Sequence, residues 1–232
     1  MIRWTGAEGV RRRAIACRAA TGAGPGRLWS GEKAVVRAPA SHDAGRRCAA
    51  ASVMSELIER DAIPEGYKVE VFAGRVIMTP RSPEQDWTVS DVKDAVKASG
   101  IARKRVFGDV LITFPGENDA APDLTIVDFD AERRKTSYSC LDVLAAVAVP
   151  SESEGEKDYV RNVQKYGRFG IDFYMIADPF ETTVTLMSEP HAVGYARVVE
   201  IPYGEPVSFT PAAGERVEIG TGAFPTCEAG GA

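Results

Sequence analysis

Histidine, cysteine and long apolar segments are all scarce in this sequence. The chain has only two histidines, His42 and His191, and four widely spaced cysteines without a Cys-x-x-Cys pair, so no zinc-binding framework is present. We expect the cysteines to be free thiols of a reducing compartment. The longest apolar run, residues 143–149, is far shorter than the ~20 residues that cross a bilayer. No apolar stretch follows Met1 as in a signal peptide, so the sequence predicts a cytoplasmic protein without a membrane partner.

Basic and acidic residues are unevenly distributed along the chain. Residues 1–53 carry ten Lys or Arg and three Asp or Glu, about +7, and the remaining 18 basic and 30 acidic residues leave about −12 for the rest. Such an acidic body offers little general affinity for nucleic acid, because Lys and Arg contacts to phosphate supply most of it. Any nucleic-acid site must therefore be a local patch.

The segment 1–53 is rich in Ala, Gly and Arg and keeps neither a helical nor a strand period for long, which predicts a disordered N-terminal extension. Three interpretations of it stay open. It is a spurious extension upstream of a natural start at Met54, a basic arm that binds nucleic acid, or an Arg-rich transit peptide.

A β-hairpin is predicted soon after Met54. Residues 54–60 form a possible short helix that ends before Pro64 and Gly66. Residues 68–72 and 75–79 then alternate in polarity around the two-residue turn Ala73-Gly74, the pattern of two antiparallel strands whose turn needs a positive φ.

A helix is predicted next, because its start carries three separate signals. Ser82 is a suitable N-cap, Pro83 fits the first helical position, and Gln85 completes a capping box. Apolar residues then recur near helical spacing, and Gly100 is a suitable C-terminal stop.

Three strands and a second helix should follow. The strands are predicted at residues 109–114, 123–128 and 142–149. The third is apolar on both faces, as expected of a central strand covered by helices on either side. The second helix should present one packing stripe before it ends at Gly170, formed by Tyr159, Val160, Val163, Tyr166 and Gly167.

The C-terminal part should be rich in strands. Strands are predicted at residues 173–177, 182–187 and 195–201, with weaker ones to about Ile219, and the Gly- and Ala-rich residues 221–232 should be a flexible tail. The whole pattern predicts an α/β (α+β) fold, with a mixed central sheet flanked by helices and a β-rich C-terminal extension, in one domain over residues 54–220.

Several pieces of the chain, in a fixed order, resemble a known family. They are Glu70-Val-Phe-Ala-Gly-Arg-Val, Ser82-Pro-Glu-Gln, Ala121-Pro-Asp-Leu-Thr-Ile-Val-Asp, Ser151, Lys157-Asp-Tyr and Tyr166-Gly-Arg-Phe-Gly-Ile-Asp-Phe-Tyr-Met-Ile-Ala-Asp-Pro. This ordered set, which spans about 110 residues, resembles the Uma-two family of restriction-endonuclease-like proteins in the PD-(D/E)XK nuclease superfamily.

The resemblance implies a Mg²⁺-dependent DNA endonuclease with a restriction-endonuclease-like fold. Phosphodiester hydrolysis needs carboxylates that hold Mg²⁺, which polarises the phosphate and activates water, and a lysine that stabilises the developing charge. By resemblance, the carboxylates come from Glu70, Asp123 and position 148, and the lysine from position 162. Glu70 and Asp123 would then be the metal ligands.

Two of these positions depart from the family pattern. Ala148 stands where Glu is expected and Asn162 where Lys is expected, so we expect little or no cleavage, as in a pseudoenzyme. Substitute charges could come from Lys157, Arg161 or Lys165, or from Glu152, Glu154 and Glu156. We expect these side chains to be solvated and to compensate poorly, because a loop positions a ligand less well than a strand.

Plainer interpretations of the remaining residues stay open. Asp123 follows Pro122 at the start of a strand and could be an ordinary turn carboxylate, Glu70 could face solvent, and Gln85 could be a helix cap or a polar neighbour of the metal. At the level of function, the alternatives are a weakened endonuclease, a non-catalytic nucleic-acid-binding module, and a degenerate copy without a biochemical role. The resemblance also suggests a homodimer.

Overall fold

A computed structural model describes residues 34–37, 67–72, 75–134, 137–151, 157–212 and 214–227, without the side chains of 34–37, 69–77 and 157. Among these residues no helix is long and apolar enough to span a membrane. The expected helix over residues 54–60, the hairpin turn at residues 73–74 and the loop carboxylates Glu152, Glu154 and Glu156 all lie outside the described residues.

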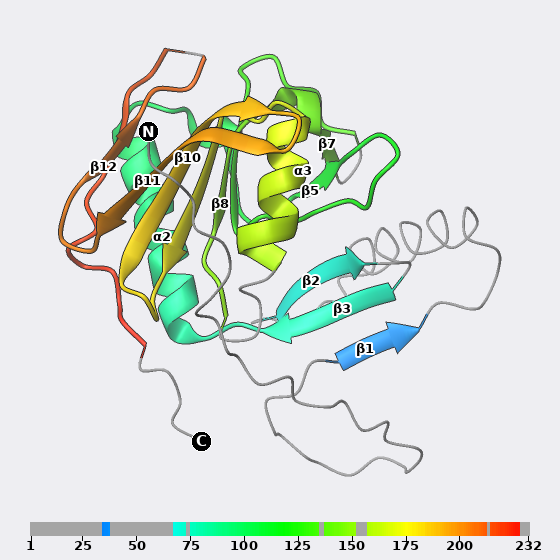
Figure 1. The fold of residues 1–232 in the computed structure, drawn as a ribbon, viewed down its shortest axis with the longest axis horizontal. Coiled ribbons are helices and arrows are strands. Elements are labelled where there is room, and N and C mark those ends of the chain that lie inside the picture. The colour runs from blue at the N-terminus through cyan, green and yellow to red at the C-terminus, as the bar shows by residue number, and fades with distance from the viewer. Residues whose placement is uncertain are drawn as a thin grey trace, which may run out of the picture. The chain divides into compact units, whose positions relative to one another are not determined.

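The described elements alternate between short strands and a few helices (Figure 1). The strands are β1 (Ala34–Arg37), β2 (Tyr67–Phe72), β3 (Arg75–Pro80), β4 (Val106–Phe107), β5 (Leu111–Thr113), β6 (Leu124–Val127), β7 (Ser137–Ser139), β8 (Val143–Ala148), β9 (Phe173–Asp178), β10 (Thr183–His191), β11 (Gly194–Pro202), β12 (Val207–Phe209) and β13 (Val217–Ile219). The helices are α2 (Pro83–Ala98), α3 (Val163–Arg168), the 3₁₀ turns η1 (Arg103–Arg105) and η2 (Cys140–Asp142), and the π-helix η3 (Lys157–Asn162).

Six strands form a mixed sheet in the order β11-β10-β9-β8-β6-β4. Only the β8–β9 pair is parallel; its strands are joined through η3 and α3, the crossover that a parallel pair requires. All six residues of β8 are buried, which agrees with the prediction of a central strand covered on both faces. The predicted α+β class with a mixed sheet is confirmed.

The two faces of this sheet carry separate hydrophobic clusters. Leu124, Ala145 and Val147 belong to one cluster together with residues of α2 and of β12 and β13. Ala146 and Ala148 belong to the other cluster, together with Tyr166 of α3 and Tyr174 of β9. Alternation along the strands therefore sends successive residues to the α2 face and to the α3 face.

Helix α2 begins as its sequence predicts. The Ser82 hydroxyl accepts a hydrogen bond from the Gln85 N–H, the Gln85 side chain accepts one from the Ser82 N–H, and Pro83 occupies the first turn. The helix ends at Ala98, and Gly100 follows with φ +94°. Local sequence alone is thus enough to define both ends of this helix.

The second helix differs from its prediction. It begins as the π-helix η3, and Tyr159 and Val160 from the expected packing stripe are exposed, whereas Asp158 and Asn162 are buried. A π-helix closes i→i+5 hydrogen bonds in place of i→i+4 bonds, so its wider turn rotates a different set of side chains toward the sheet. Over the first turn of this helix, apolar spacing consequently does not predict which side chains are buried.

The predicted hairpin is present as β2 paired with β3. A third strand, β1, pairs antiparallel with β3, although we expected no regular structure before residue 54. Its sequence, Ala-Val-Val-Arg, has two β-branched residues that favour a strand once a partner edge is available. The other residues of 1–53 lie outside the described part of the chain.

The predicted C-terminal strands are present, and the structured region extends beyond Ile219. Residues 221–227, expected in the flexible tail, pack onto the domain: Phe224 is buried and its ring lies 5.3 Å from that of Tyr203. The Cys227 N–H also donates to the Pro179 carbonyl. Burial of one aromatic ring therefore stabilises a segment for which the Gly and Ala content predicted flexibility.

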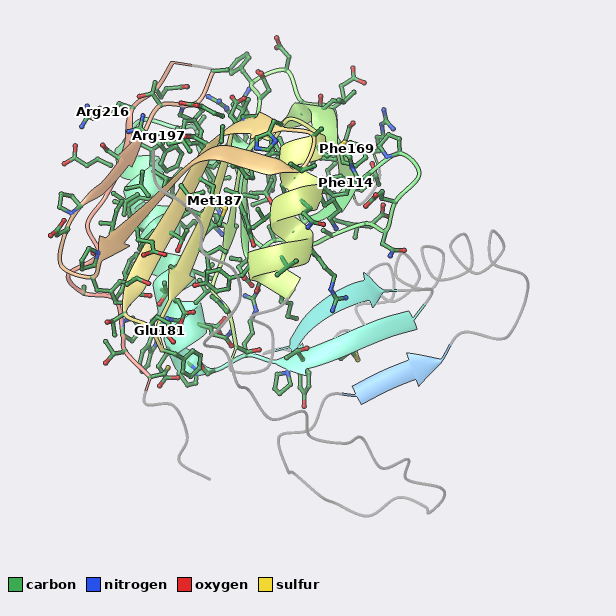
Figure 2. All side chains as sticks on the ribbon, viewed as in Figure 1. Phe114, Phe169, Glu181, Met187, Arg197 and Arg216 are labelled. Atoms are coloured by element: carbon green, nitrogen blue, oxygen red, sulfur yellow. The ribbon has the colours of Figure 1, made fainter. Side chains whose placement is uncertain are left out.

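Helix α3 contacts the β10–β11 hairpin backbone to backbone. A Cβ added at Gly167 would lie 1.9 Å from the carbonyl oxygen of Gly194, which itself has φ +140°. At Gly167 any side chain would collide with this backbone, and at Gly194 the positive φ strains any residue that has a Cβ. Directly after α3, the ring of Phe169 packs edge-on against that of Phe114, with 5.2 Å between the ring centroids (Figure 2).

Candidate functional site

Asp123 is the centre of a buried ion-pair network. Its side chain is 4% exposed. Its Oδ2 accepts a hydrogen bond from the Val149 N–H at 2.8 Å, while its Oδ1 lies 2.8 Å from Arg81 Nη2 and 2.9 Å from Lys68 Nζ. Both carboxylate oxygens are therefore engaged by donors from three different segments of the chain.

The two cations keep this carboxylate charged. Burial alone would raise the pKa of Asp123, but Lys68, Arg81 and the Val149 N–H outweigh burial and hold the pKa below its ordinary value. Burial likewise would lower the pKa of the Arg81 guanidinium, and Asp123, Asp109 and Asp86 raise it. The buried Asp123 carboxylate is thus held in its charged form beside Arg81 and Lys68.

Asp109 belongs to the same network. Its Oδ1 accepts a hydrogen bond from Arg81 Nη2, the nitrogen that also donates to Asp123. Its backbone is left-handed, with φ 51°, a conformation that Asp tolerates better than most residues, and β5 therefore begins only at Leu111. Burial raises the pKa of Asp109 to about 6 against the opposing charge of Arg81, although 44% of its side-chain surface is exposed, so that water moderates this shift.

Ala148 lies beside Asp123 across the sheet. In the antiparallel register of β6 and β8, Leu124 faces Val147, so Asp123 is next to Ala148. Ala148 is buried on the α3 face and supplies no ligand. Gln85 reaches the same strand end, where its Nε2 donates to the Val149 carbonyl at 3.0 Å. Gln85 is therefore both a helix cap and a link between α2 and the peptide that binds Asp123.

Asn162 and Asp158 approach the site from the π-helix. Asn162 Nδ2 donates to Asp158 Oδ1 at 2.9 Å, and both side chains are buried. Both lie near the buried hydroxyl of Tyr174: burial raises its pKa above the ordinary value, the charge of Asp158 adds to this effect and that of Asp123 contributes last. The charges of Asp158 and Asp123 both act on the Tyr174 hydroxyl, and Asp158 has the larger effect.

The structure brings Asp123, Ala148 and Gln85 to one end of β8, which Gln85 reaches from α2. Asn162 is buried near Tyr174 on the α3 face. Glu70 pairs with Ile77 in the hairpin register, and its side chain lies outside the described part of the chain. Alternation along β2 places position 70 on the same face as Lys68. Its role in the site stays a prediction. Lys165 is directed elsewhere, over the ring of Phe114 at 4.8 Å.

Sequence reasoning missed Lys68, Arg81 and Asp109. Arg81 and Asp123 are 42 positions apart, and no local pattern links residues at that separation. One signal was available for Lys68, because it precedes Glu70 by two residues on a predicted strand and must share its face. Arg81 and Asp109 have no comparable signal in a single sequence.

The described residues do not fit the Mg²⁺ that the resemblance implies. Mg²⁺ requires several oxygen ligands in near-octahedral geometry, and no group of three or more His, Cys, Asp or Glu side chains in the described part of the chain is arranged to hold a metal ion. The Asp123 oxygen nearest to Asp109 is already shared by a guanidinium and an ammonium, and Ala148 adds no oxygen. A divalent ion would have to displace both cations.

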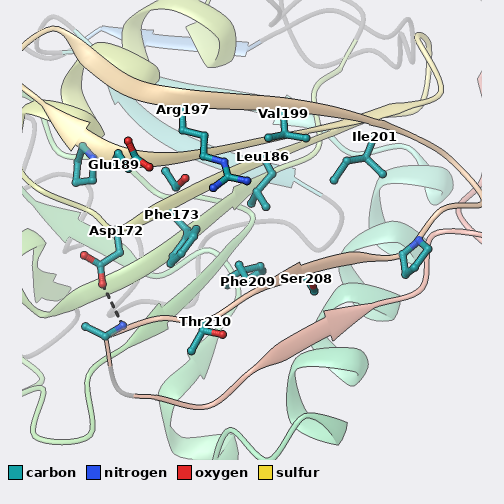
Figure 3. A pocket seen from close by; sticks show the side chains of 14 residues that line it. Asp172, Phe173, Leu186, Glu189, Arg197, Val199, Ile201, Ser208, Phe209 and Thr210 are labelled. Atoms are coloured by element: carbon teal, nitrogen blue, oxygen red, sulfur yellow. Dashed lines mark hydrogen bonds between the residues drawn. The ribbon is translucent and has the colours of Figure 1, made fainter.

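A pocket of about 640 Å³ lies elsewhere, between the β9–β11 part of the sheet and the strand β12 (Figure 3). Phe173, Leu186 and Phe209 form its apolar floor, and Arg197 reaches over them from β11. Its floor belongs to the α2-face cluster, whereas Asp123 belongs to the other face. This pocket and the ionised network are therefore separate features.

Comparison with known proteins assigns the chain to a family. A comparison with curated proteins found no match. Among solved structures, a protein from Anabaena variabilis, titled a putative nuclease belonging to DUF820, is 20% identical with a TM-score of 0.45, over 65% of this chain and 87% of that one. The model of the family Uma2, described as "Putative restriction endonuclease", matches residues 54–219. Because this match covers most of the chain, including every described residue of the Asp123 network, the protein belongs to the Uma2 family.

Proposed function

We propose that this protein binds nucleic acid, with DNA as the main candidate, and that it hydrolyses phosphodiesters weakly or not at all. The observation that carries the proposal is the state of Asp123, whose carboxylate is taken up by Val149, Arg81 and Lys68. Because position 148 is Ala and position 162 is Asn, the site lacks a second strand carboxylate and a helix lysine.

The chemistry of hydrolysis explains why these changes matter. A divalent cation, when bound in such a site, polarises the phosphate and lowers the pKa of water. Asp123 cannot serve as its ligand while both cations hold it, and Asn162 donates its amide to Asp158 without contributing a positive charge. Loss of one electrostatic contact to the transition state typically costs on the order of 10²-fold in rate.

Nucleic-acid binding is supported by basic residues next to the site. Arg161 lies in η3, and Lys165 and Arg168 lie in α3, where Lys165 covers the Phe114 ring and Arg168 pairs with Glu117. Arg161 and Arg168 are exposed, and Arg161 is the sequence neighbour of Asn162. This is the kind of local basic patch that an acidic protein needs in order to contact phosphates.

Binding and cleavage assays test the proposal together. We expect salt-sensitive retention of a labelled DNA in fluorescence anisotropy, weakened in the double variant Arg161→Gln/Arg168→Gln. Arg216→Gln is the matched control, because Arg216 is exposed just before β13 and away from α3 (Figure 2). Absence of any binding at low salt would refute the proposal.

The cleavage arm uses plasmid and single-stranded DNA with Mg²⁺ or Mn²⁺. We expect little or no product from the wild-type chain, and more product after Ala148→Glu/Asn162→Lys, because this pair restores the family's two missing charges. Rapid metal-dependent cutting by the wild type that Asp123→Ala abolishes would instead establish an active endonuclease.

A residual nuclease with a rearranged site is the second candidate. The observation in its favour is Asp158, a buried carboxylate on the same face as Asp123 that is fixed by Asn162. If Asp158 replaces the carboxylate missing at position 148, Asp158→Asn removes any residual cleavage and leaves DNA binding intact. Equal cleavage by the variant and the wild type would exclude this candidate.

Two further expectations complete the proposal. A homodimer in solution would be seen by light scattering, and a cytoplasmic location by fractionation of the source cells. Both stay predictions.

A further inference from the structure

Two carboxylates and one guanidinium nitrogen form an arrangement that resembles an occupied cation site. Asp109 Oδ1 and Asp123 Oδ1 both accept hydrogen bonds from the same atom, Arg81 Nη2. A third carboxylate, Asp86, lies 3.4 Å from Nη1 of the same guanidinium. In protein sites for hard cations, carboxylate oxygens surround one positive centre in the same way.

The positive charge at this centre comes entirely from side chains. Lys68 Nζ is a second cation on the Asp123 oxygen that Arg81 contacts, at 2.9 Å. Three carboxylates and two cations leave a formal charge of −1, so most of the attraction that would draw in a divalent ion is already cancelled. An added ion would also face strong repulsion from two positive groups at short range.

Arg81 is well held in this position. Its side chain is 12% exposed and those of Lys68 and Asp123 are 6% and 4% exposed, and a guanidinium retains its charge at any ordinary pH. Arg81 also directly precedes Ser82, the capped start of α2, so its backbone is fixed by the helix it introduces. The guanidinium is therefore a permanent part of the site.

We propose that Arg81, assisted by Lys68, is an internal counter-ion that occupies the place of a divalent metal ion between Asp109 and Asp123. The site is then held together without metal, and Mg²⁺ and Mn²⁺ bind only when Arg81 is removed. This inference rests on the proposed function only in that it gives a physical cause for the weak hydrolysis proposed above.

Metal binding by the protein alone tests this inference. We expect wild-type chain to show no Mn²⁺ binding in isothermal titration at millimolar metal, and no change in Tm with Mg²⁺ or Mn²⁺. Arg81→Gln removes the positive charge and keeps a polar side chain. It should bind Mn²⁺ at least about tenfold more tightly than the wild type, because one repelling unit charge is lost, and its Tm should rise with added metal.

Two controls separate this effect from a general response to charge. Arg81→Gln/Asp109→Asn should lose the metal response again, because one of the two carboxylates is gone. Arg168→Gln breaks an exposed ion pair with Glu117 outside the site and should acquire no metal response. A folded Arg81→Gln variant that binds no more Mn²⁺ than the wild type overturns the inference.

If Arg81→Gln fails to fold, the Mn²⁺ titration of the wild-type chain still tests the inference. Mn²⁺ binding to the wild type that competes with Mg²⁺ and is weakened by Asp109→Asn overturns the inference, whereas absence of binding supports it. No nucleic acid enters these measurements, so the inference and the proposed function fail separately. Metal-independent cleavage of DNA, for example, would contradict the proposed function and leave the assignment of Arg81 intact.

Discussion

The two faces of the central sheet are built from opposite kinds of residue. Strands β6 and β8 present apolar side chains to the α2 face, with Leu124, Ile126 and Val147 packed against the helix and the C-terminal strands. The α3 face buries charged and polar side chains among its apolar residues, including Asp123 and Asp158. Neighbouring residues of one strand therefore serve two different purposes.

This difference shows on which face of the sheet the burial of side chains carries a free-energy cost. Burial of apolar surface stabilises a domain, and this effect does not depend on the orientation of the contacting groups. The α2 face therefore contributes to stability without requiring particular pairs of polar groups. Buried charges stabilise little and become costly when one partner is lost. The α3 face is therefore stable only while its buried charges are paired with opposite charges. Single substitutions on each face test this comparison.

Asp123→Ala should have the largest effect. It leaves Lys68 and Arg81 buried without their main acidic partner, and breaking a buried ion pair typically costs about 3–5 kcal/mol. Urea unfolding followed by circular dichroism would measure the loss. A decrease below about 1 kcal/mol would show that the network relaxes into solvent and that the α3 face is less constrained than we infer.

Leu124→Ala is the matched change on the α2 face, one residue away. Leu124 is fully buried, and removal of such a side chain costs about 2–5 kcal/mol, depending on how far the cavity collapses. We expect a value near the lower end, because the strand is short. Unlike Asp123→Ala, this loss should not change with salt, and DNA binding by the folded fraction should stay as in the wild type.

Ser82→Ala should have a smaller effect, about 1 kcal/mol, because it removes the cap of α2 and one half of the capping box. The same unfolding experiment would measure it. Ser82→Asp, which preserves capping, is the control and should retain most of the stability. A loss as large as that of Leu124→Ala would mean that the helix start also holds Arg81 in place.

The smallest effect concerns pH, and its sign differs between the two network carboxylates. The pKa of Asp109 is raised to about 6, so its contribution to the free energy of unfolding is fully present below its ordinary pKa and is lost as pH rises toward 6. Asp123 has a lowered pKa, so its contribution is present above the ordinary value and is lost on acidification.

Asp109→Asn should therefore flatten the stability profile between about pH 4 and pH 6 and leave the acid limb unchanged. Unfolding free energies at a series of pH values would measure this difference. An unchanged slope in the variant would indicate that solvent screens Asp109 completely, as its partial exposure allows.

Much of the fold could be predicted from the sequence because its signals are local. The capping box at Ser82 and Gln85, the alternating hairpin and the apolar run of β8 each depend on neighbouring residues. The π-helix could not be predicted in this way, since its register is set by burial of Asp158 and Asn162 against the sheet. The packed segment around Phe224 could not be predicted either, because it packs against residues that are distant in the sequence.

The candidate site was predictable only in part. The family order singled out Asp123, Ala148 and Asn162, and the strand register places Asp123 beside Ala148. A catalytic role of these positions stays a prediction. Lys68 and Arg81 were not predicted as partners, because ion pairs between distant segments leave no periodic trace in one sequence. The charges that decide whether a metal can bind are thus set by tertiary contacts.

The contact between Gly167 and Gly194 limits how this protein can change over time. Because two backbones touch there without intervening side chains, the height of α3 above the sheet is fixed by the tip of a hairpin whose turn lies more than twenty positions further along the chain. A methyl group at Gly167 would collide with the Gly194 backbone and push α3, which follows η3 with Asp158 and Asn162, away from the hairpin. Changes at this hairpin tip, outside the Asp123 network, would therefore alter the position of α3 and of the polar pair on η3.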